Sequence, residues 1–120
     1  MTRLKEITAR QILDSKITEK QFTQQVIQLL LTCGFDFVYH TFNSLHSPRG
    51  FPDLIALRVR DKRLLFAELK SDKGVLLAEQ ADWINALREI GCEAHLWRPS
   101  DWDEIVGICS RPHPYREESI

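Results

Sequence analysis

The spacing of apolar residues along the chain predicts three helices. Residues 19–33 and 77–90 carry apolar side chains three or four positions apart, as one face of an amphipathic helix does. Residues 102–109 have the same spacing over a shorter length. Glycines directly after the first two segments, Gly34 and Gly91, are typical of helix ends. Two of the helices are preceded by a capping-box pattern: Thr18 with Gln21, and Ser100 with Asp103.

Short runs of apolar and β-branched residues predict the strands between these helices. Residues 35–42 and 93–97 each read as a single strand. Residues 54–59 and 64–69 are apolar runs on either side of the charged segment 60–63, which is typical of a β-hairpin. The elements therefore follow the order α-β-β-β-α-β-α, which predicts an α/β domain.

The hairpin holds acidic and basic residues in otherwise apolar surroundings. A turn centred between residues 60 and 61 places Asp53 opposite Glu68, and a turn centred one residue later places it opposite Lys70. Glu68 and Lys70 leave the same face of their strand because they are two residues apart. Both registers bring the three side chains within reach of one another. Two adjacent carboxylates need a cation or a shared proton.

Two interpretations of this cluster follow from the residues alone. Carboxylate oxygens, with water and substrate phosphate, are the ligands of a Mg²⁺ site that acts on phosphate groups. Alternatively, Lys70 forms a simple ion pair with one of the acids at the edge of the sheet. The spacing is compatible with both.

Polar residues on the predicted helices and loops are further candidates. Glu19, in the first turn of its helix, either faces the cluster or complements the helix dipole. Gln80 lies on an apolar helix stripe, where it either orients the Lys70 amine, water or phosphate, or is a half-exposed residue at the helix start. Residues in or next to the predicted loops are candidates for substrate contact, although each could equally be an ordinary solvated residue: His40, His46, Ser47, Arg49 and Lys73.

Composition limits the class of protein. The 120 residues are 43% hydrophobic and 28% charged, which fits one domain with a single core. No apolar run is long enough to cross a membrane, and the N-terminus lacks the apolar segment of a secretion signal, so we expect a cytoplasmic protein without a membrane partner. Three cysteines without a C-x-x-C pair indicate neither a disulfide framework nor a zinc cluster.

The charge balance alone does not indicate a nucleic-acid-binding protein. The formal net charge is −1 and the isoelectric point is about 6.4. Basic residues are nevertheless concentrated between positions 49 and 73, where Arg58 and Arg63 are among them. The local charge near the hairpin can therefore differ from that of the whole chain.

The order of these elements resembles the PD-(D/E)XK nuclease fold. This resemblance implies a restriction-endonuclease-like core with a central mixed β-sheet flanked by helices. Three segments look like the signature blocks of the VRR-NUC family, whose small stand-alone members occur in phages and bacteria: Gly50-Phe51-Pro52-Asp53-Leu54, Glu68-Leu69-Lys70 and Gln80. The resemblance covers about residues 18–106. We expect a nuclease domain at 18–109 between an N-terminal arm at 1–17, which is weakly amphipathic, and a flexible tail at 110–120, which is polar and rich in proline.

The resemblance also implies roles for individual residues. Asp53, Glu68 and the carbonyl of Leu69 would bind Mg²⁺ or Mn²⁺, with Glu19 as a further candidate ligand. Lys70 would orient or deprotonate the attacking water, and Gln80 would support Lys70 or that water.

The activity implied by the resemblance is metal-dependent cleavage of DNA. The substrate would be branched DNA such as Holliday junctions or flaps, cut by a homodimer in DNA repair in a bacterial or phage-infected cell. The alternative is a nucleic-acid-binding or interaction module that has the same fold without activity.

Overall fold

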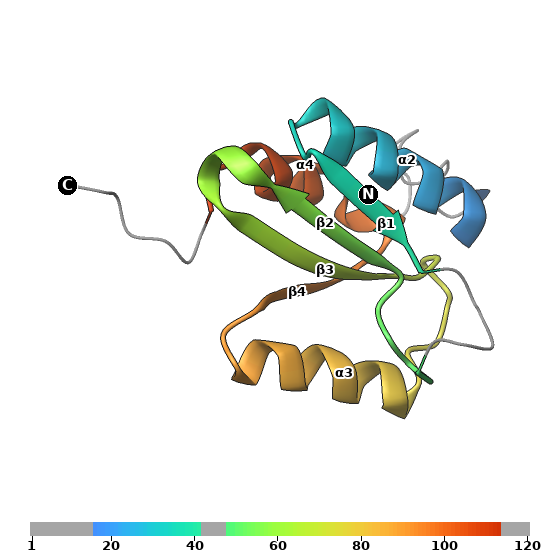
Figure 1. The fold of residues 1–120 in the computed structure, drawn as a ribbon. Coiled ribbons are helices and arrows are strands. Elements are labelled where there is room, and N and C mark those ends of the chain that lie inside the picture. The colour runs from blue at the N-terminus through green and yellow to red at the C-terminus, as the bar shows by residue number, and fades with distance from the viewer. Residues whose placement is uncertain (1–15, 42–47, 114–120) are drawn as a thin grey trace, which may run out of the picture.

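The computed structural model describes residues 16–41 and 48–113 (Figure 1). The predicted arm up to residue 15, the candidates His46 and Ser47, and the tail from residue 114 lie outside the described residues. The elements in chain order are α2 (Glu19–Thr32), β1 (Phe37–His40), β2 (Leu54–Arg58), the 3₁₀ helix η2 (Val59–Asp61), β3 (Arg63–Leu69), α3 (Ala78–Glu89), β4 (Glu93–Trp97), the 3₁₀ helix η3 (Pro99–Asp101) and α4 (Trp102–Ser110).

A mixed four-stranded sheet forms the centre of the domain, in the order β1-β2-β3-β4. The first three strands are antiparallel neighbours, whereas β3 and β4 are parallel and are connected by α3. Helices α2 and α4 cover one face of the sheet, and α3 covers the other (Figure 1). The predicted mixed α/β fold with flanking helices is thus confirmed. No described helix has the length and apolar character needed to span a membrane.

The core is divided by the sheet into two apolar clusters. The larger cluster joins α2 and α4 to alternate residues of the strands, including Leu54, Leu65 and Trp97. The smaller one lies under α3, where Ile84 and Leu87 pack on β4. The two sides are unequal because α3 is the single described helix on its side of the sheet.

Two boundary predictions are changed by local hydrogen bonds. The first strand spans four residues rather than 35–42, because Phe35 is buried and its N–H binds the carbonyl of Leu30. The Thr18–Gln21 capping box is confirmed, with both reciprocal bonds present. The predicted Ser100–Asp103 box is wrong, because the Ser100 N–H binds the Asp72 side chain and no side-chain cap forms at α4.

The hairpin adopts the first of the two predicted registers. Leu54 pairs with Ala67 and Arg58 pairs with Arg63, so Asp53 lies opposite Glu68 one step further along. The connection differs from the simple turn predicted at 60–63, because η2 extends the turn back to Val59. Lys62 closes it in the left-handed conformation, with φ of 54°.

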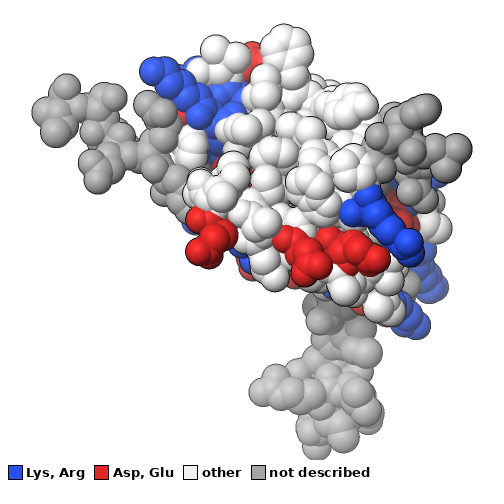
Figure 2. All heavy atoms as spheres, turned by 60° about the horizontal axis from the view of Figure 1, so that its bottom comes forward, with Lys and Arg blue, Asp and Glu red and all other residues white. Residues whose placement is uncertain are grey.

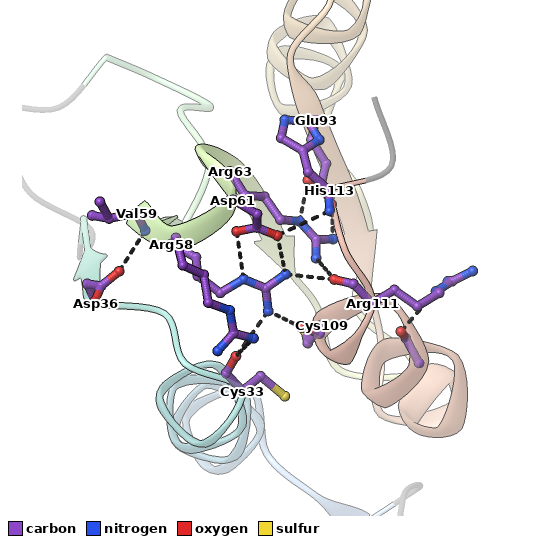
Figure 3. Close-up of polar contacts among 12 residues, drawn as sticks. Cys33, Asp36, Arg58, Val59, Asp61, Arg63, Glu93, Cys109, Arg111 and His113 are labelled. Carbon is purple, nitrogen blue, oxygen red and sulfur yellow. Dashed lines mark hydrogen bonds and ion pairs between the residues drawn. The ribbon is translucent and has the colours of Figure 1, made fainter. Parts of the chain in front are cut away.

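Two buried arginines occupy the end of the hairpin where this turn lies (Figure 3), and we call Arg58 and Arg63 the arginine pair. Each is 1% exposed. Arg58 binds Asp61 through two hydrogen bonds of 2.9 and 2.7 Å. Arg63 binds Glu93 through two bonds of 2.8 and 2.6 Å. Burial alone would raise the pKa of Glu93, but the bonds from Arg63 and His95 outweigh it and lower the pKa to about 2.

The arginine pair also binds the backbone where two helices end. Arg58 Nη1 donates to the carbonyls of Cys33, after α2, and Cys109, in α4, at 3.0 and 2.9 Å. The carbonyl of Arg111 accepts from both buried arginines, at 2.6 and 2.9 Å. These carbonyls lack partners within their own helices, so the guanidinium groups satisfy them. The boundary predicted at residue 110 falls inside α4, and the first residues beyond the helix pack against the domain.

The arginine pair corrects one inference about charge. Arg58 and Arg63 were counted among the basic residues that raise the local charge near the hairpin. Both are buried and paired with carboxylates, so neither is available to phosphate groups at the surface.

Candidate active site

Two carboxyl groups lie side by side at the other end of the hairpin. Asp53 immediately precedes β2, and its Oδ2 accepts a hydrogen bond of 2.9 Å from the backbone N–H of Leu69. Glu68 lies on β3 with 1% exposure. Its Oε1 is buried and has no hydrogen-bond partner within the described part of the chain. Burial of an acceptor without a donor is costly, so this atom indicates a missing partner.

The environment of Glu68 favours its protonated form. Burial is the main cause, and the neighbouring Asp53 carboxylate is the next, so the pKa of Glu68 is raised to about 8. Lys70 opposes this shift without cancelling it. Without a cation, Glu68 is therefore mainly protonated at neutral pH.

Lys70 follows directly after β3 and points toward the same pair. Its side chain is 13% exposed, and its Nζ lies 3.9 Å from Oε2 of Glu68. Its backbone N–H binds the carbonyl of Trp97 at 3.1 Å. The ion pair of the simpler interpretation is thus present, but it is long. One ammonium group facing two carboxyl groups also leaves Glu68 Oε1 without a donor.

Gln80 contacts the site through a partner different from the predicted one. Its Nε2 donates to Glu68 Oε2 at 2.9 Å, whereas the prediction from position gave the Lys70 amine, a water or a phosphate as its partner, or no partner in the site. Its Oε1 accepts from the backbone N–H of Leu77 at 2.9 Å, so the amide is held from both sides. Gln80 therefore fixes the orientation of the Glu68 carboxyl group.

Glu19 lies at the outer edge of the site. It is exposed in the first turn of α2. Its negative charge is one of the causes that raise the pKa of Glu68, so the structure places it near the buried pair. The position supports the interpretation that it faces the cluster, while its exposure leaves it free to interact with the helix dipole as well.

The three described candidates for substrate contact, His40, Arg49 and Lys73, do not lie at one point. His40 pairs with Leu54, so its side chain leaves the face of the sheet opposite to that of Asp53. Arg49 is largely exposed and forms an ion pair of 3.4 Å with Glu79. Lys73 is exposed in the loop after Lys70.

Residues that sequence reasoning missed hold the segment leading to Asp53. The indole N–H of Trp83 donates to the carbonyl of Arg49 at 3.1 Å, and its ring packs edge-on against Phe51 at 4.8 Å. The hydroxyl of Thr41 donates to the carbonyl of Pro52 at 3.0 Å. The indole N–H of a partly buried tryptophan needs an acceptor. This requirement is the one signal in the sequence that could have indicated a role for Trp83 in holding a neighbouring segment.

Gly50 lets the same segment approach α3, and its replacement is expected to damage the site. A Cβ at residue 50 would lie 2.5 Å from the backbone carbonyl carbon of Glu79, and φ is +84°. We expect Gly50→Ala to lower the free energy of unfolding by about 2–3 kcal/mol and to reduce activity by displacing Asp53. Gly91→Ala is the matched control, because φ is +89° and no atom lies within 4 Å. Equal losses in thermal unfolding for both variants would contradict the contact with α3.

The oxygen donors at this site suit a hard divalent cation. A buried carboxylate oxygen without a donor, beside a second carboxylate, is the arrangement that a cation stabilises. The described residues hold no group of three or more His, Cys, Asp or Glu side chains that could bind a metal ion. The residues that would hold such a cation are Asp53 and Glu68, whose carboxyl groups lie next to each other.

The raised pKa of Glu68 predicts how the metal-free protein responds to pH. The folded state holds a proton on Glu68 up to about pH 8, whereas an unperturbed glutamate has a pKa of 4.5. Between these values the folded state binds more protons, so the free energy of unfolding falls as the pH rises. In the wild type we expect the free energy of unfolding to fall by on the order of 2–4 kcal/mol over this pH range, and Glu68→Gln should abolish that fall. Denaturant unfolding in EDTA from pH 5 to 9 measures it, with Glu89→Gln on the exposed side of α3 as the control.

A mixed sheet with adjacent acids at a hairpin end and a neighbouring lysine defines a restriction-endonuclease-like α/β domain. The model of the VRR-NUC domain family matches residues 18–100, so the chain belongs to this nuclease-type family. A solved structure described as a VRR-NUC domain protein is 20% identical, with a TM-score of 0.52 over 77% of this chain and 84% of its own, which shows the shared fold. No curated protein matches the chain. The predicted family is confirmed.

Proposed function

We propose that this domain is a Mg²⁺- or Mn²⁺-dependent endonuclease that hydrolyses phosphodiester bonds in DNA. The observation that carries the proposal is the buried Glu68 carboxyl group, which has one oxygen without a donor, lies against Asp53 and faces the Lys70 amine. Asp53, Glu68 and the carbonyl of Leu69 hold the cation. When bound, the cation stabilises negative charge on the phosphate and lowers the pKa of water.

The residues of the chain have separate tasks in this proposal. The Leu69 N–H fixes Asp53, and the Gln80 amide fixes Glu68, so neither carboxyl group needs to reorient when substrate binds. Lys70 places its ammonium group beside the same point. There it donates a hydrogen bond to the attacking water or to a phosphate oxygen, and as the free amine it accepts the proton of that water.

The surface charge gives limited support for DNA binding. Figure 2 shows the side of the molecule that carries α3, where acidic side chains line one edge and basic side chains gather at separate places, with an uncharged area between them. Acids of α3 include Glu79, Asp82 and Glu89. The DNA path we propose therefore stays clear of the acidic side chains of α3 and passes Lys70 and Lys73.

We further propose that the substrate is branched DNA cut by a homodimer. A junction requires two incisions, and two copies related by a two-fold axis provide two sites. Strand β1 lies at the edge of the sheet, with Phe37 and Tyr39 exposed by 65% and 62% on the face that also carries Asp53. An uncharged edge strand with exposed aromatic residues is suited to pairing with a second copy.

A cleavage panel tests the activity. Labelled Holliday junction, flap and linear duplex are incubated with the protein and Mg²⁺, Mn²⁺ or EDTA. We expect cleavage of the branched substrates with either metal and none with EDTA. Failure to cleave any substrate with either metal would contradict the proposed nuclease activity. DNA binding without cleavage, together with no calorimetric signal for either metal, would favour a binding module on the same fold.

The dimer is tested separately by light scattering. We expect twice the chain mass of 14.0 kDa, and a shift toward the monomer when Tyr39→Glu places a charge on the edge strand. A monomeric protein that still cleaves DNA would remove the dimer from the proposal and leave the nuclease activity in place.

A further inference from the structure

The loop that follows Lys70 is held by one side chain from the neighbouring strand. Residues 71–74 form a tight turn in which the Gly74 N–H binds the Ser71 carbonyl at 3.0 Å. Nη1 of Arg98, the residue after β4, donates to the carbonyls of Ser71 and Gly74 at 2.7 Å each. The Asp72 carbonyl lies 3.5 Å from the same nitrogen. Nη1 of the Arg98 guanidinium group thus contacts three carbonyl oxygens of the turn.

A second set of bonds fixes the region that supports Arg98. The Ser100 N–H donates to Asp72 Oδ1 at 3.0 Å, so η3 is also hydrogen-bonded to the turn. The Arg98 N–H donates to Asp101 Oδ2 at 2.9 Å, which ties the backbone of Arg98 to the same 3₁₀ helix. The turn is therefore held against the end of β4 and cannot move independently of it.

The turn packs against the Lys70 side chain. A Cβ built on Gly74 would lie 3.4 Å from Cδ of Lys70, which places the backbone of the turn beside the aliphatic stem of the lysine. Just before Arg98, Trp97 binds the Lys70 N–H through its carbonyl. The end of β4 thus constrains Lys70 in two ways. Trp97 binds the Lys70 backbone directly, and Arg98 holds the turn that packs against the Lys70 side chain.

We propose that Arg98 is a positioning residue for Lys70, because it holds the turn at residues 71–74 against the lysine stem and so limits where the ammonium group points. A free lysine side chain samples many rotamers, and fixing it in one of them costs conformational entropy. Arg98 supplies this order before substrate binds. The inference rests on the proposed function, in which the Lys70 amine acts on water or phosphate.

Two variants distinguish the hydrogen bonds donated by Arg98 from the packing of its aliphatic side chain. Arg98→Met keeps a similar aliphatic length without a donor. Arg98→Lys restores one cationic nitrogen with three donors, which matches the single nitrogen that makes the three contacts. Arg88→Met is the control, because Arg88 also binds a backbone carbonyl, that of Ala94, at 2.8 Å, away from the turn.

The first readout is kinetic. We expect Arg98→Met to lower kcat on the cleaved DNA substrate by about 10- to 100-fold with little change in KM, and Arg98→Lys to restore most of the rate. Metal affinity measured by calorimetry should remain within twofold, because Arg98 contacts neither carboxyl group. A loss that appears in KM alone, or equally in Arg88→Met, would overturn the positioning role.

The second readout does not depend on activity. In protein labelled with ¹³C at lysine Cε, the Lys70 signal is assigned by its loss in Lys70→Ala. We expect it to be displaced from the free-lysine position in the wild type and to move toward that position in Arg98→Met, with recovery in Arg98→Lys. If Arg98→Met does not fold, the Arg98→Lys protein is compared with the wild type, and a Lys70 signal at the free-lysine position there overturns the inference.

The two readouts keep the inference distinct from the proposed function. A wild-type protein that cleaves nothing, but whose Lys70 signal depends on Arg98, would refute the nuclease proposal and leave the positioning contact in place. Unchanged Lys70 signals and unchanged kcat in Arg98→Met would refute the positioning role while the nuclease proposal stands.

Discussion

Replacing Lys70 with alanine is expected to lower the rate of DNA cleavage by about 10²- to 10⁴-fold, because the attacking water and the phosphate lose their ammonium partner. The fold should be unaffected, since the contact of the amine with Glu68 is long, at 3.9 Å. Mg²⁺ binding should persist, because Asp53 and Glu68 remain. Single-turnover cleavage and titration calorimetry measure the two effects separately.

Lys62→Asn provides the control for this experiment. Lys62 is an exposed lysine in the turn at the far end of the hairpin, and asparagine tolerates its left-handed backbone. This variant removes the same charge without touching the site, and we expect it to cleave at the wild-type rate. Glu68→Gln should differ from Lys70→Ala by losing metal binding along with cleavage. Normal cleavage by Lys70→Ala would show that the amine does not act on the water.

Replacing Arg63 with alanine is expected to lower the free energy of unfolding by about 3–5 kcal/mol, because the buried Glu93 would lose both hydrogen bonds from Arg63 and keep the one with His95. The side chains of Arg63 and Glu93 are both 0% exposed, and the bonds between them are 2.8 and 2.6 Å. Denaturant unfolding at neutral pH measures the loss. Arg49→Ala, which breaks an exposed ion pair with Glu79, should change stability by less than about 1 kcal/mol. Equal losses in the two variants would contradict the importance of burial.

The hairpin and its acids were predictable because their pattern is local. Side chains alternate along strands, so two apolar runs around a charged turn determine which residues can face each other. The pairing of Leu54 with Ala67 selects one of two registers that the sequence left open, since the choice depends on the turn. The 3₁₀ turn and the left-handed Lys62 could not be predicted, because no glycine or asparagine marks that position.

Long-range contacts account for what the sequence did not show. Arg58 reaches Cys109 across 51 residues, and nothing near Arg58 indicates that two helix ends meet there. Arginines beside a turn are usually exposed, so Arg58 and Arg63 were counted as surface charge. Gln80 was expected at the site from its place on α3, but its partner depends on how closely α3 approaches β3. The close approach of Gly50 to α3 is likewise a contact between distant parts of the chain, which the local sequence does not indicate.

The arginine pair has a consequence for the precision of the distant carboxyl groups. Arg58 and Arg63 face each other in the ladder, and both are bonded to backbone atoms outside the hairpin. They therefore fix the alignment of the two strands, which carries over about 17 Å to Asp53 and Glu68. A slip of one residue would bring Leu69 opposite Asp53 and turn Glu68 to the other face. The relative position of the two carboxyl groups is thus determined at the opposite end of the hairpin.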